Sequence, residues 1–308
     1  MSIFYHRMDE KLICQKCENY KRGGKEYKRK KAYNNHESIC PGPKKKKEQN
    51  AGEKAEVKVK QDLDANMDNP IYLVPIFGDR ASDGIVICGY DEKPTKDFTK
   101  AGSGYKADIV IYFKKTGKIS KISIKCWDGS EPSLMNHTPR RAVVFQENGK
   151  LNQCVKNLDK FIDEYKKMRS SGECAEDVSI MDILECVPVD DRDAVKKTLI
   201  EVTAYFTFDG TGTYESKCPA DSVLNITDSK DPSTWKFEIC DTPEKKNEYI
   251  ESKLPRLRVS LRSSKGMPDP TKKDYKLKLQ ACEPWVFIVK NQETGVIVYK
   301  GALHIRYK

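Results

Sequence analysis

The order of apolar and polar residues predicts a folded body that begins near residue 69 and continues along the rest of the chain. Short apolar runs bounded by Gly, Pro or charged residues are typical of buried strands. Three such runs lie at 71–77, 84–89 and 107–113. The polar, Gly-containing segment 114–118 predicts a hairpin turn, so residues 119–127 are the expected return strand.

Helical spacing appears further along the chain. Apolar residues recur three or four positions apart over 151–169, which predicts an amphipathic helix, and a second helix is expected within 175–203. A third helix is expected after Thr242, because a Thr cap followed by Pro is a common helix start. Two further runs predict a C-terminal hairpin, at 284–290 and 295–307. The body is therefore expected to have a mixed α/β fold.

The first 68 residues have a different character. We expect a small module over 1–43, a basic flexible linker over the polar, lysine-rich residues 44–68, and a large domain over 69–308. The charge follows a similar division. The first 60 residues contain 17 Lys and Arg against 8 Asp and Glu, whereas the rest contain 39 and 38. A basic head of this kind most often contacts nucleic acid or an anionic membrane surface.

Composition narrows the cellular setting. The sequence contains no apolar run long enough to cross a bilayer and no secretory pattern near Met1, so we expect neither a membrane span nor a secretory leader. The 11 cysteines are odd in number and mostly stand alone in apolar runs, which favours a reducing, intracellular compartment. The Pro-Lys-Lys-Lys-Lys segment at 43–47 resembles a nuclear localisation signal, and it equally suits a tether on phosphate. The expected location is the cytoplasm or the nucleus.

The N-terminal module carries a zinc-binding pattern. Cys14 and Cys17 are two residues apart, and His36 and Cys40 are spaced by one helical turn, as in tetrahedral structural zinc sites. The connection between the two pairs is longer than in the common two-Cys, two-His finger. The sequence therefore predicts a bound Zn²⁺, which either only folds the module or also presents it to DNA.

Basic residues interleaved with Tyr occupy the connection between the two ligand pairs, and this composition suits contact with DNA phosphates. A solvated basic face is the alternative interpretation. The residues that we expect to contact DNA here are Lys21, Arg22, Lys28, Arg29, Lys30 and Lys31.

A candidate catalytic group lies on the predicted hairpin of the body. Asp108 opens one strand, and Ser123 and Lys125 lie on the return strand. Because side chains alternate along a strand, Ser123 and Lys125 share a face, and Asp108 and Lys125 would project into one site. An ordinary hairpin with an edge Asp and a surface Lys is the alternative.

This segment resembles the PD-(D/E)xK nuclease superfamily, which includes many type II restriction endonucleases. The resemblance implies a mixed central sheet flanked by helices, with Asp108 as a ligand of Mg²⁺. It also implies that Lys125 activates the attacking water and stabilises charge on the phosphate. Ser123 stands where the family carries a second acid. Glu147 is our candidate replacement, and the alternatives are Asp79, Asp83, Asp128 and Glu131.

Further residues could touch DNA. A polar segment follows Lys125, in which Asn136 and His137 could reach the scissile phosphate and Arg140 or Arg141 could hold the backbone. A loop histidine without a catalytic role is the alternative for His137. Three arginines alternate along a strand-like run and could contact bases or phosphates, although a solvated strand face has the same pattern. These three are Arg256, Arg258 and Arg262.

Together these features predict a site-specific, Mg²⁺-dependent endonuclease of restriction type that hydrolyses double-stranded DNA and carries an N-terminal zinc finger. Many such enzymes dimerise so that two sites cut two strands, and a homodimer is therefore expected. The alternative is a non-catalytic nucleic-acid-binding regulator, for which Ser123 would mark lost activity. A third interpretation is a zinc-stabilised scaffold protein without chemistry.

Overall fold

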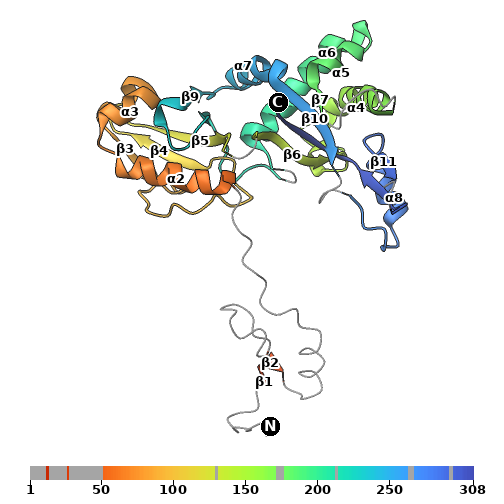
Figure 1. Ribbon diagram of the computed structural model, residues 1–308, viewed down its shortest axis with the longest axis horizontal. Helices are drawn as coiled ribbons and strands as arrows, with labels where there is room; N and C mark the ends of the chain where they lie inside the picture. Colours follow the sequence, from red (N-terminus) through yellow and green to blue (C-terminus); the bar gives the residue numbers. More distant parts are fainter. Residues whose placement is uncertain are drawn as a thin grey trace. The chain divides into compact units, whose positions relative to one another are not determined.

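The computed structural model divides the chain into two compact units, Met1–Gln49 and Asn50–Lys308 (Figure 1). It describes residues 12–13, 26–27, 51–128, 131–170, 177–211, 214–262, 267–290 and 294–308. In the first unit, β1 (Leu12–Ile13) pairs antiparallel with β2 (Glu26–Tyr27). The predicted zinc ligands and basic residues of this unit lie outside the described residues, namely Cys14, Cys17, His36, Cys40, Lys21, Arg22, Lys28, Arg29, Lys30 and Lys31.

The second unit begins with a helix inside the expected linker. α2 (Ala51–Ala65) buries Ala55, Val59 and Leu63, which recur every four residues and form one narrow apolar stripe. These residues pack into the same core cluster as the strands of the first sheet. The expectation of a flexible linker over 44–68 is therefore corrected for residues 51–65, because the stripe is hidden in a composition dominated by Lys, Glu and Asp.

A second helix replaces an expected strand. α3 (Pro70–Phe77) covers the run predicted as a strand at 71–77. Asn69 caps it, with its side chain accepting a hydrogen bond from the Tyr72 N–H at 3.4 Å, and Pro70 occupies the first turn. The buried residues recur with the spacing of a helix and not along the whole run. Leu73, Ile76 and Phe77 are buried, whereas Ile71 is 87% exposed.

The first sheet is mixed and has the strand order β3-β4-β5-β8-β9. β3 (Ile85–Cys88), β4 (Ile109–Phe113) and β5 (Lys118–Cys126) form an antiparallel meander, in which the hairpin of β4 and β5 was predicted from the sequence. β8 (Ser222–Ile226) then pairs parallel to β5, and β9 (Trp235–Ile239) pairs antiparallel to β8. Helices α2 and α3 pack against this sheet (Figure 1).

The second sheet is antiparallel and has the order β6-β13-β10-β7. Its strands are β6 (Ser133–Pro139), β13 (Ala302–Tyr307), β10 (Leu257–Arg262) and β7 (Val178–Ser179). The polar segment after Lys125 was expected to be a loop, but its residues 133–139 form this edge strand. Leu134, Met135 and Thr138 are buried, whereas Asn136 is exposed.

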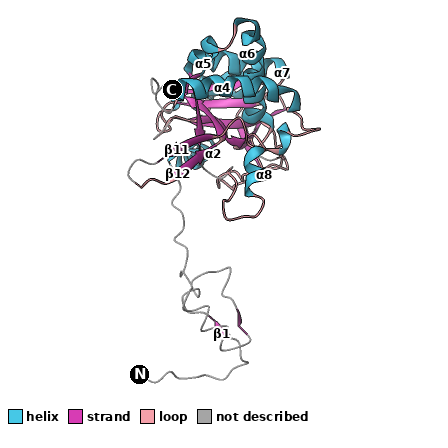
Figure 2. Cartoon of the chain, turned by 90° about the vertical axis from the view of Figure 1, so that its right-hand side faces the viewer, coloured by secondary structure: helices cyan, strands magenta, loops and turns pink. Residues whose placement is uncertain are grey.

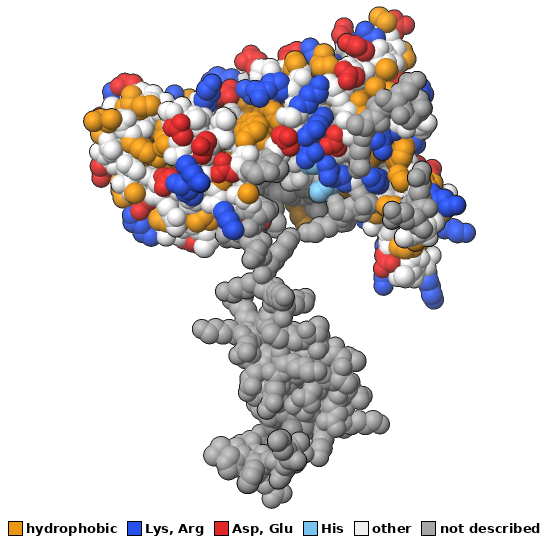
Figure 3. Space-filling view, in the orientation of Figure 1, with side chains coloured by type: hydrophobic (Ala, Val, Ile, Leu, Met, Phe, Trp, Pro, Cys, Tyr) orange, Lys and Arg blue, Asp and Glu red, His pale blue; other side chains and the backbone are white. Residues whose placement is uncertain are grey.

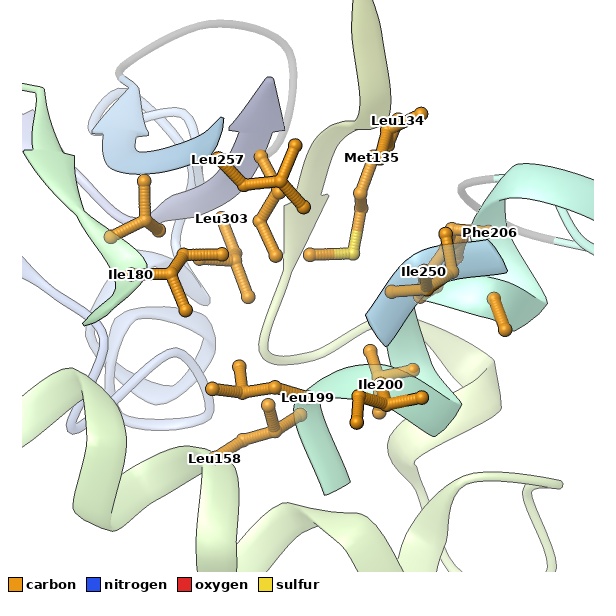
Figure 4. Packing of buried hydrophobic residues seen from close by; sticks show 14 of the residues in the cluster. Leu134, Met135, Leu158, Ile180, Leu199, Ile200, Phe206, Ile250, Leu257 and Leu303 are labelled. Carbon is orange, nitrogen blue, oxygen red and sulfur yellow. The ribbon is translucent and has the colours of Figure 1, made fainter. Parts of the chain in front are cut away.

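Four helices cover one face of the second sheet. They are α4 (Val155–Ser170), α5 (Ile180–Cys186), α6 (Val189–Ala204) and α7 (Pro243–Lys253), and Figure 2 shows them gathered on one side of the strands. Figure 4 shows Leu158 and Leu199 of these helices pointing toward Leu257 and Leu303 of the sheet. Thr242 caps α7 by accepting a hydrogen bond from the Lys245 N–H at 3.3 Å, as its sequence signature predicted.

The remaining elements connect these layers. β11 (Phe287–Lys290) and β12 (Ile297–Lys300) form the expected C-terminal hairpin, beyond which β13 turns away to join the second sheet. α8 (Tyr275–Gln280) precedes this hairpin, and α6 runs into a π-helical turn, η5 (Tyr205–Asp209). The short 3₁₀ helices are η2 (Gly78–Ala81), η3 (Val143–Phe145), η4 (Asn152–Cys154), η6 (Pro232–Thr234) and η7 (Leu254–Arg256).

The prediction of a mixed α/β body with a mixed central sheet and flanking helices is confirmed. Among the described residues, no helix has the length and apolar character needed to span a membrane.

Candidate functional site

Asp108 lies directly before β4 and faces the return strand. One of its carboxylate oxygens, Oδ2, accepts a hydrogen bond from the Ile124 N–H at 2.7 Å and one from the Ser123 hydroxyl at 3.3 Å. The register pairs Ile109 with Ile122, and strand alternation therefore puts Asp108, Ser123 and Lys125 on one face. Ser123 is 1% exposed, so it serves here as a buried donor that fixes the Asp108 carboxylate.

Asp108 and Lys125 perturb each other's ionisation. Burial raises the pKa of Asp108 to about 6, the positive charge of Lys125 opposes this rise, and the negative charge of Glu56 adds to it. Burial lowers the pKa of Lys125, and the charges of Asp108 and Glu56 oppose that change. Desolvation thus outweighs pairing for both groups, which brings the two pKa values closer to neutrality. Such perturbed pairs are typical of functional sites.

Glu56 is the third member of this group, and sequence reasoning missed it. It is 8% exposed on the inner side of α2, and its Oε1 accepts hydrogen bonds from Lys60 Nζ at 2.7 Å and from the Ala101 N–H at 2.8 Å. The residue was hidden because its helix was taken for a linker. The spacing of Ala55, Val59 and Leu63 could have revealed the helix and placed Glu56 beside its buried stripe.

Lys106 is a second basic residue near Asp108 and Lys125. Burial lowers the pKa of Lys106 to about 8, and the nearby charge of Lys125 lowers it further, while Asp108 opposes the change. Lys106 precedes Asp108 by two residues, and its backbone N–H donates to the Ser216 hydroxyl at 2.9 Å. Sequence reasoning did not single it out, because a lysine just before a strand carries no distinctive pattern.

The segment before Asp108 is bound to α2. Lys60 Nζ donates to the Thr99 carbonyl at 2.8 Å, and Lys96 pairs with Asp64 at 2.6 Å. Lys100 also pairs with Glu53 near the start of the helix. These contacts hold Glu56 against the end of the sheet where Asp108 lies.

A cavity of about 550 Å³ opens over this group. Its walls come from the start of α2, the end of β5, and the residues that lead into β6. The lining residues are Ala51, Gly52, Glu53, Glu56, Lys100, Asp108, Ile124, Lys125, Cys126, Asp128, Glu131, Pro132, Ser133 and Asn136. The cavity thus brings together residues that are far apart in the sequence, including Asn136, which we expected near a phosphate.

The candidate second carboxylates fall in different places. Asp128 and Glu131 line the cavity, where Asp128 accepts a hydrogen bond from the Ser229 N–H at 3.2 Å. Glu147 is exposed and is not among the residues that line the cavity. Asp79 pairs with Lys115 at 2.7 Å, and Asp83 accepts a hydrogen bond from its neighbour Ser82. Glu56, rather than any of these, lies close enough to Asp108 to shift its pKa.

The histidine and the arginines expected on the polar segment are engaged within the fold. His137 stacks on His304 with 4.9 Å between ring centroids. Arg140 pairs with Asp159 at 3.2 Å, and Arg141 lowers the pKa of the Cys282 thiol, which burial raises more strongly. None of these three lines the cavity at Asp108.

The three alternating arginines do not share one environment. Arg256 belongs to the 3₁₀ turn η7 and lies over the Tyr307 ring at 6.0 Å. Arg258 and Arg262 lie on β10 and project from the face opposite the helices, where Asp177 contacts both. The expected single face is therefore formed by Arg258 and Arg262 alone.

The donor set at Asp108 allows one mode of metal binding. The described residues hold no group of three or more His, Cys, Asp or Glu side chains placed to bind a metal ion. Mg²⁺ commonly takes only one or two carboxylates and completes its shell with water and substrate phosphate. The carboxylates of Asp108 and Glu56 fit that mode, because both residues line the same cavity at the end of the sheet.

Comparisons of the chain with protein families, with curated proteins and with solved structures give no match. The chemistry of the site therefore has to be argued from its own residues: two carboxylates, a lysine with a lowered pKa, and an open cavity.

Proposed function

We propose that this chain is a Mg²⁺-dependent endonuclease of restriction type, which hydrolyses phosphodiester bonds of double-stranded DNA at specific sites. The observation that carries the proposal is the meeting of Asp108, Glu56 and Lys125 at one buried sheet end below an open cavity. Acid and lysine on neighbouring strands are the arrangement that the PD-(D/E)xK resemblance implies. Glu56 supplies the second carboxylate that Ser123 cannot provide.

Each residue has a distinct role in this proposal. Asp108, with a pKa of about 6, is mostly ionised at neutral pH and would hold a cation together with Glu56. Mg²⁺, when bound, would neutralise phosphate charge and favour ionisation of water. Lys125, whose pKa is lowered, accepts a proton from the attacking water or stabilises the developing charge on the phosphate. Ser123 and the Ile124 N–H hold Asp108 in place.

The test is cleavage of a plasmid of known sequence by the full chain with Mg²⁺, followed by sequencing of the ends. We expect discrete cuts, and we expect Lys125→Met to reduce the rate by about 10³-fold, the scale of losing a positioned acid–base group. Lys121→Met is the matched control, because Lys121 lies on the same strand and pairs with Glu92 at 2.9 Å. It should leave the rate within about twofold.

Two outcomes would contradict the proposal. Intact plasmid with both Mg²⁺ and Mn²⁺ would remove the catalytic function. Cleavage by Lys125→Met at the rate of the parent chain would remove the site assignment. A chain that binds duplex DNA but never cuts it would instead be the non-catalytic regulator, which the serine at position 123 favours.

We also propose that the first unit binds one Zn²⁺ through Cys14, Cys17, His36 and Cys40. The support is the spacing of these residues, together with the pairing of Leu12–Ile13 with Glu26–Tyr27, whose connection contains both Cys14 and Cys17. Metal analysis of the purified chain should give about one zinc per chain, and Cys14→Ser should abolish it. Absence of zinc from the chain, purified without chelator, would contradict this proposal.

A further inference from the structure

The face of the second sheet that points away from the helices carries a row of arginines. Arg258 and Arg306 are direct partners across the β10–β13 ladder, and Arg262 lies further along β10 on the same face. Like charges placed opposite each other on neighbouring strands repel. A fold that keeps Arg258 and Arg306 in this register therefore needs negative charge between them.

Two carboxylates supply that charge in the free protein. Asp177, just before β7, contacts Arg306 at 2.5 Å, Arg262 at 3.6 Å and Arg258 at 3.7 Å. Glu131 contacts Arg258 at 3.3 Å and Arg306 at 3.9 Å. We name Arg258, Arg262 and Arg306 the arginine triad. Its three positive charges meet two negative charges, so one positive charge remains unbalanced.

The hydrogen bonding of the triad is also incomplete. Arg306 Nε and Asp177 Oδ1 are both buried, and neither has a hydrogen-bond partner among the described residues. His304 adds no charge, because burial and the neighbouring Arg262 lower its pKa to about 3. Its Nδ1 therefore accepts the Arg262 Nε–H at 2.7 Å. Arg262 is thus held in place by a neutral ring.

The arginine triad adjoins the candidate site. Glu131 and Ser133 line the cavity over Asp108, Glu131 contacts two of the arginines, and the Ser133 hydroxyl hydrogen-bonds His304 Nε2. Figure 3 shows a band of Lys and Arg side chains near β10, with acidic side chains directly against it. A DNA backbone that reaches Asp108 could therefore extend over the triad.

We propose that the arginine triad binds a backbone phosphate of duplex DNA next to the cleaved bond, and that Asp177 and Glu131 occupy this phosphate site until DNA displaces them. The inference rests on the proposed function for the identity of the ligand. Guanidinium groups bind phosphate oxygens and carboxylate oxygens with the same planar geometry, so each anion can substitute for the other. The two carboxylates then weaken binding to any DNA that cannot compete with them.

The proposal predicts opposite effects for the two halves of the cluster. Without added divalent ions, anisotropy of a labelled duplex should show Asp177→Asn binding about 5- to 10-fold tighter, because a competing carboxylate is removed. Arg306→Gln should bind about 10-fold more weakly and lower the salt dependence by about one phosphate contact. A purely structural ion pair would predict that both changes weaken binding.

Glu251→Gln is the matched control. It also removes one negative charge and releases a lysine, Lys196, from a 2.7 Å ion pair, but on helices α6 and α7 away from the triad. Its affinity for the duplex should stay within about twofold. If Glu251→Gln bound the duplex more tightly by the same factor as Asp177→Asn, the change in net charge alone would explain the effect. That result would overturn the proposal.

If Asp177→Asn does not fold, the affinity of Glu131→Gln for the duplex provides a second test. This substitution should also tighten binding, and unchanged or weaker binding by folded variants of both carboxylates would overturn the inference. If millimolar inorganic phosphate displaced the duplex more than chloride does at equal ionic strength, the arginine triad would be a site for a free anion instead of a DNA phosphate. Binding without added divalent ions is independent of cleavage. Tighter binding without any nuclease activity would therefore contradict only the proposed catalysis, and cleavage without tighter binding only this inference.

Discussion

The two sheets of the second unit carry charge in opposite ways. The first sheet holds the half-buried Asp108 and Lys125 at one end, where desolvation dominates and shifts each pKa toward neutrality. On the face away from its helices the second sheet holds Arg258 and Arg306, with carboxylates between them, and there Arg306 helps to lower the pKa of Asp177. Groups whose charged form is opposed by desolvation can exchange protons, whereas arginines that are paired with carboxylates can exchange one anion for another. This difference fits the two proposals, which place chemistry on the first sheet and phosphate binding on the second.

After the loss expected for Lys125→Met, the largest expected effect concerns the second carboxylate of the first sheet. Glu56→Gln should reduce cleavage by about 10²- to 10³-fold, because it halves the carboxylate set available to a cation. Glu147→Gln, a change of the same type at an exposed position, should leave the rate unchanged. Single-turnover rates at saturating Mg²⁺ measure both. Equal rates for the two variants would show that Glu56 is a structural residue and would break the assignment of chemistry to this sheet.

A smaller effect concerns the stability cost of the buried acid. The folded pKa of Asp108 is about 6, above its ordinary value of 3.8, so the folded state prefers the protonated form. This contribution to stability is present below about pH 4 and is lost as the pH rises through 6. At pH 7 without metal, Asp108→Asn should therefore raise the free energy of unfolding by about 1–3 kcal/mol. Denaturant titration measures it, and a variant that is less stable at pH 7 would contradict the role of desolvation.

The smallest effect has the opposite pH dependence and belongs to the second sheet. His304 has a folded pKa of about 3 against 6.5 ordinarily, so its contribution to stability is lost as the pH falls below 6.5. Between pH 7 and pH 5, the parent chain should lose about 2 kcal/mol more than His304→Gln. Urea denaturation at the two pH values measures the difference. Identical pH dependence for both chains would mean that His304 takes up a proton in the folded state.

Local patterns were enough for much of the fold. The hairpin that joins β4 and β5, the helix α4 and the Thr242 cap of α7 were predicted because each depends on residues close together in the sequence. The same locality made Asp108 and Lys125 recognisable as neighbours. The sequence prediction was wrong where two local patterns in the same segment favoured different structures. The apolar run at 71–77 looks like a strand, but Asn69 and Pro70 start a helix there.

The sequence by itself determined the alternation that puts Asp108, Ser123 and Lys125 on one face, because strand periodicity requires no distant partner. Only the tertiary structure decided that Glu56 completes this group, since α2 becomes a helix by burying a narrow stripe against the sheet. Tertiary structure also decided that Arg306, more than forty residues after Arg258, faces it across a ladder. In both cases the neighbours are brought together by the burial of apolar surface elsewhere in the unit, which no local pattern of charges records.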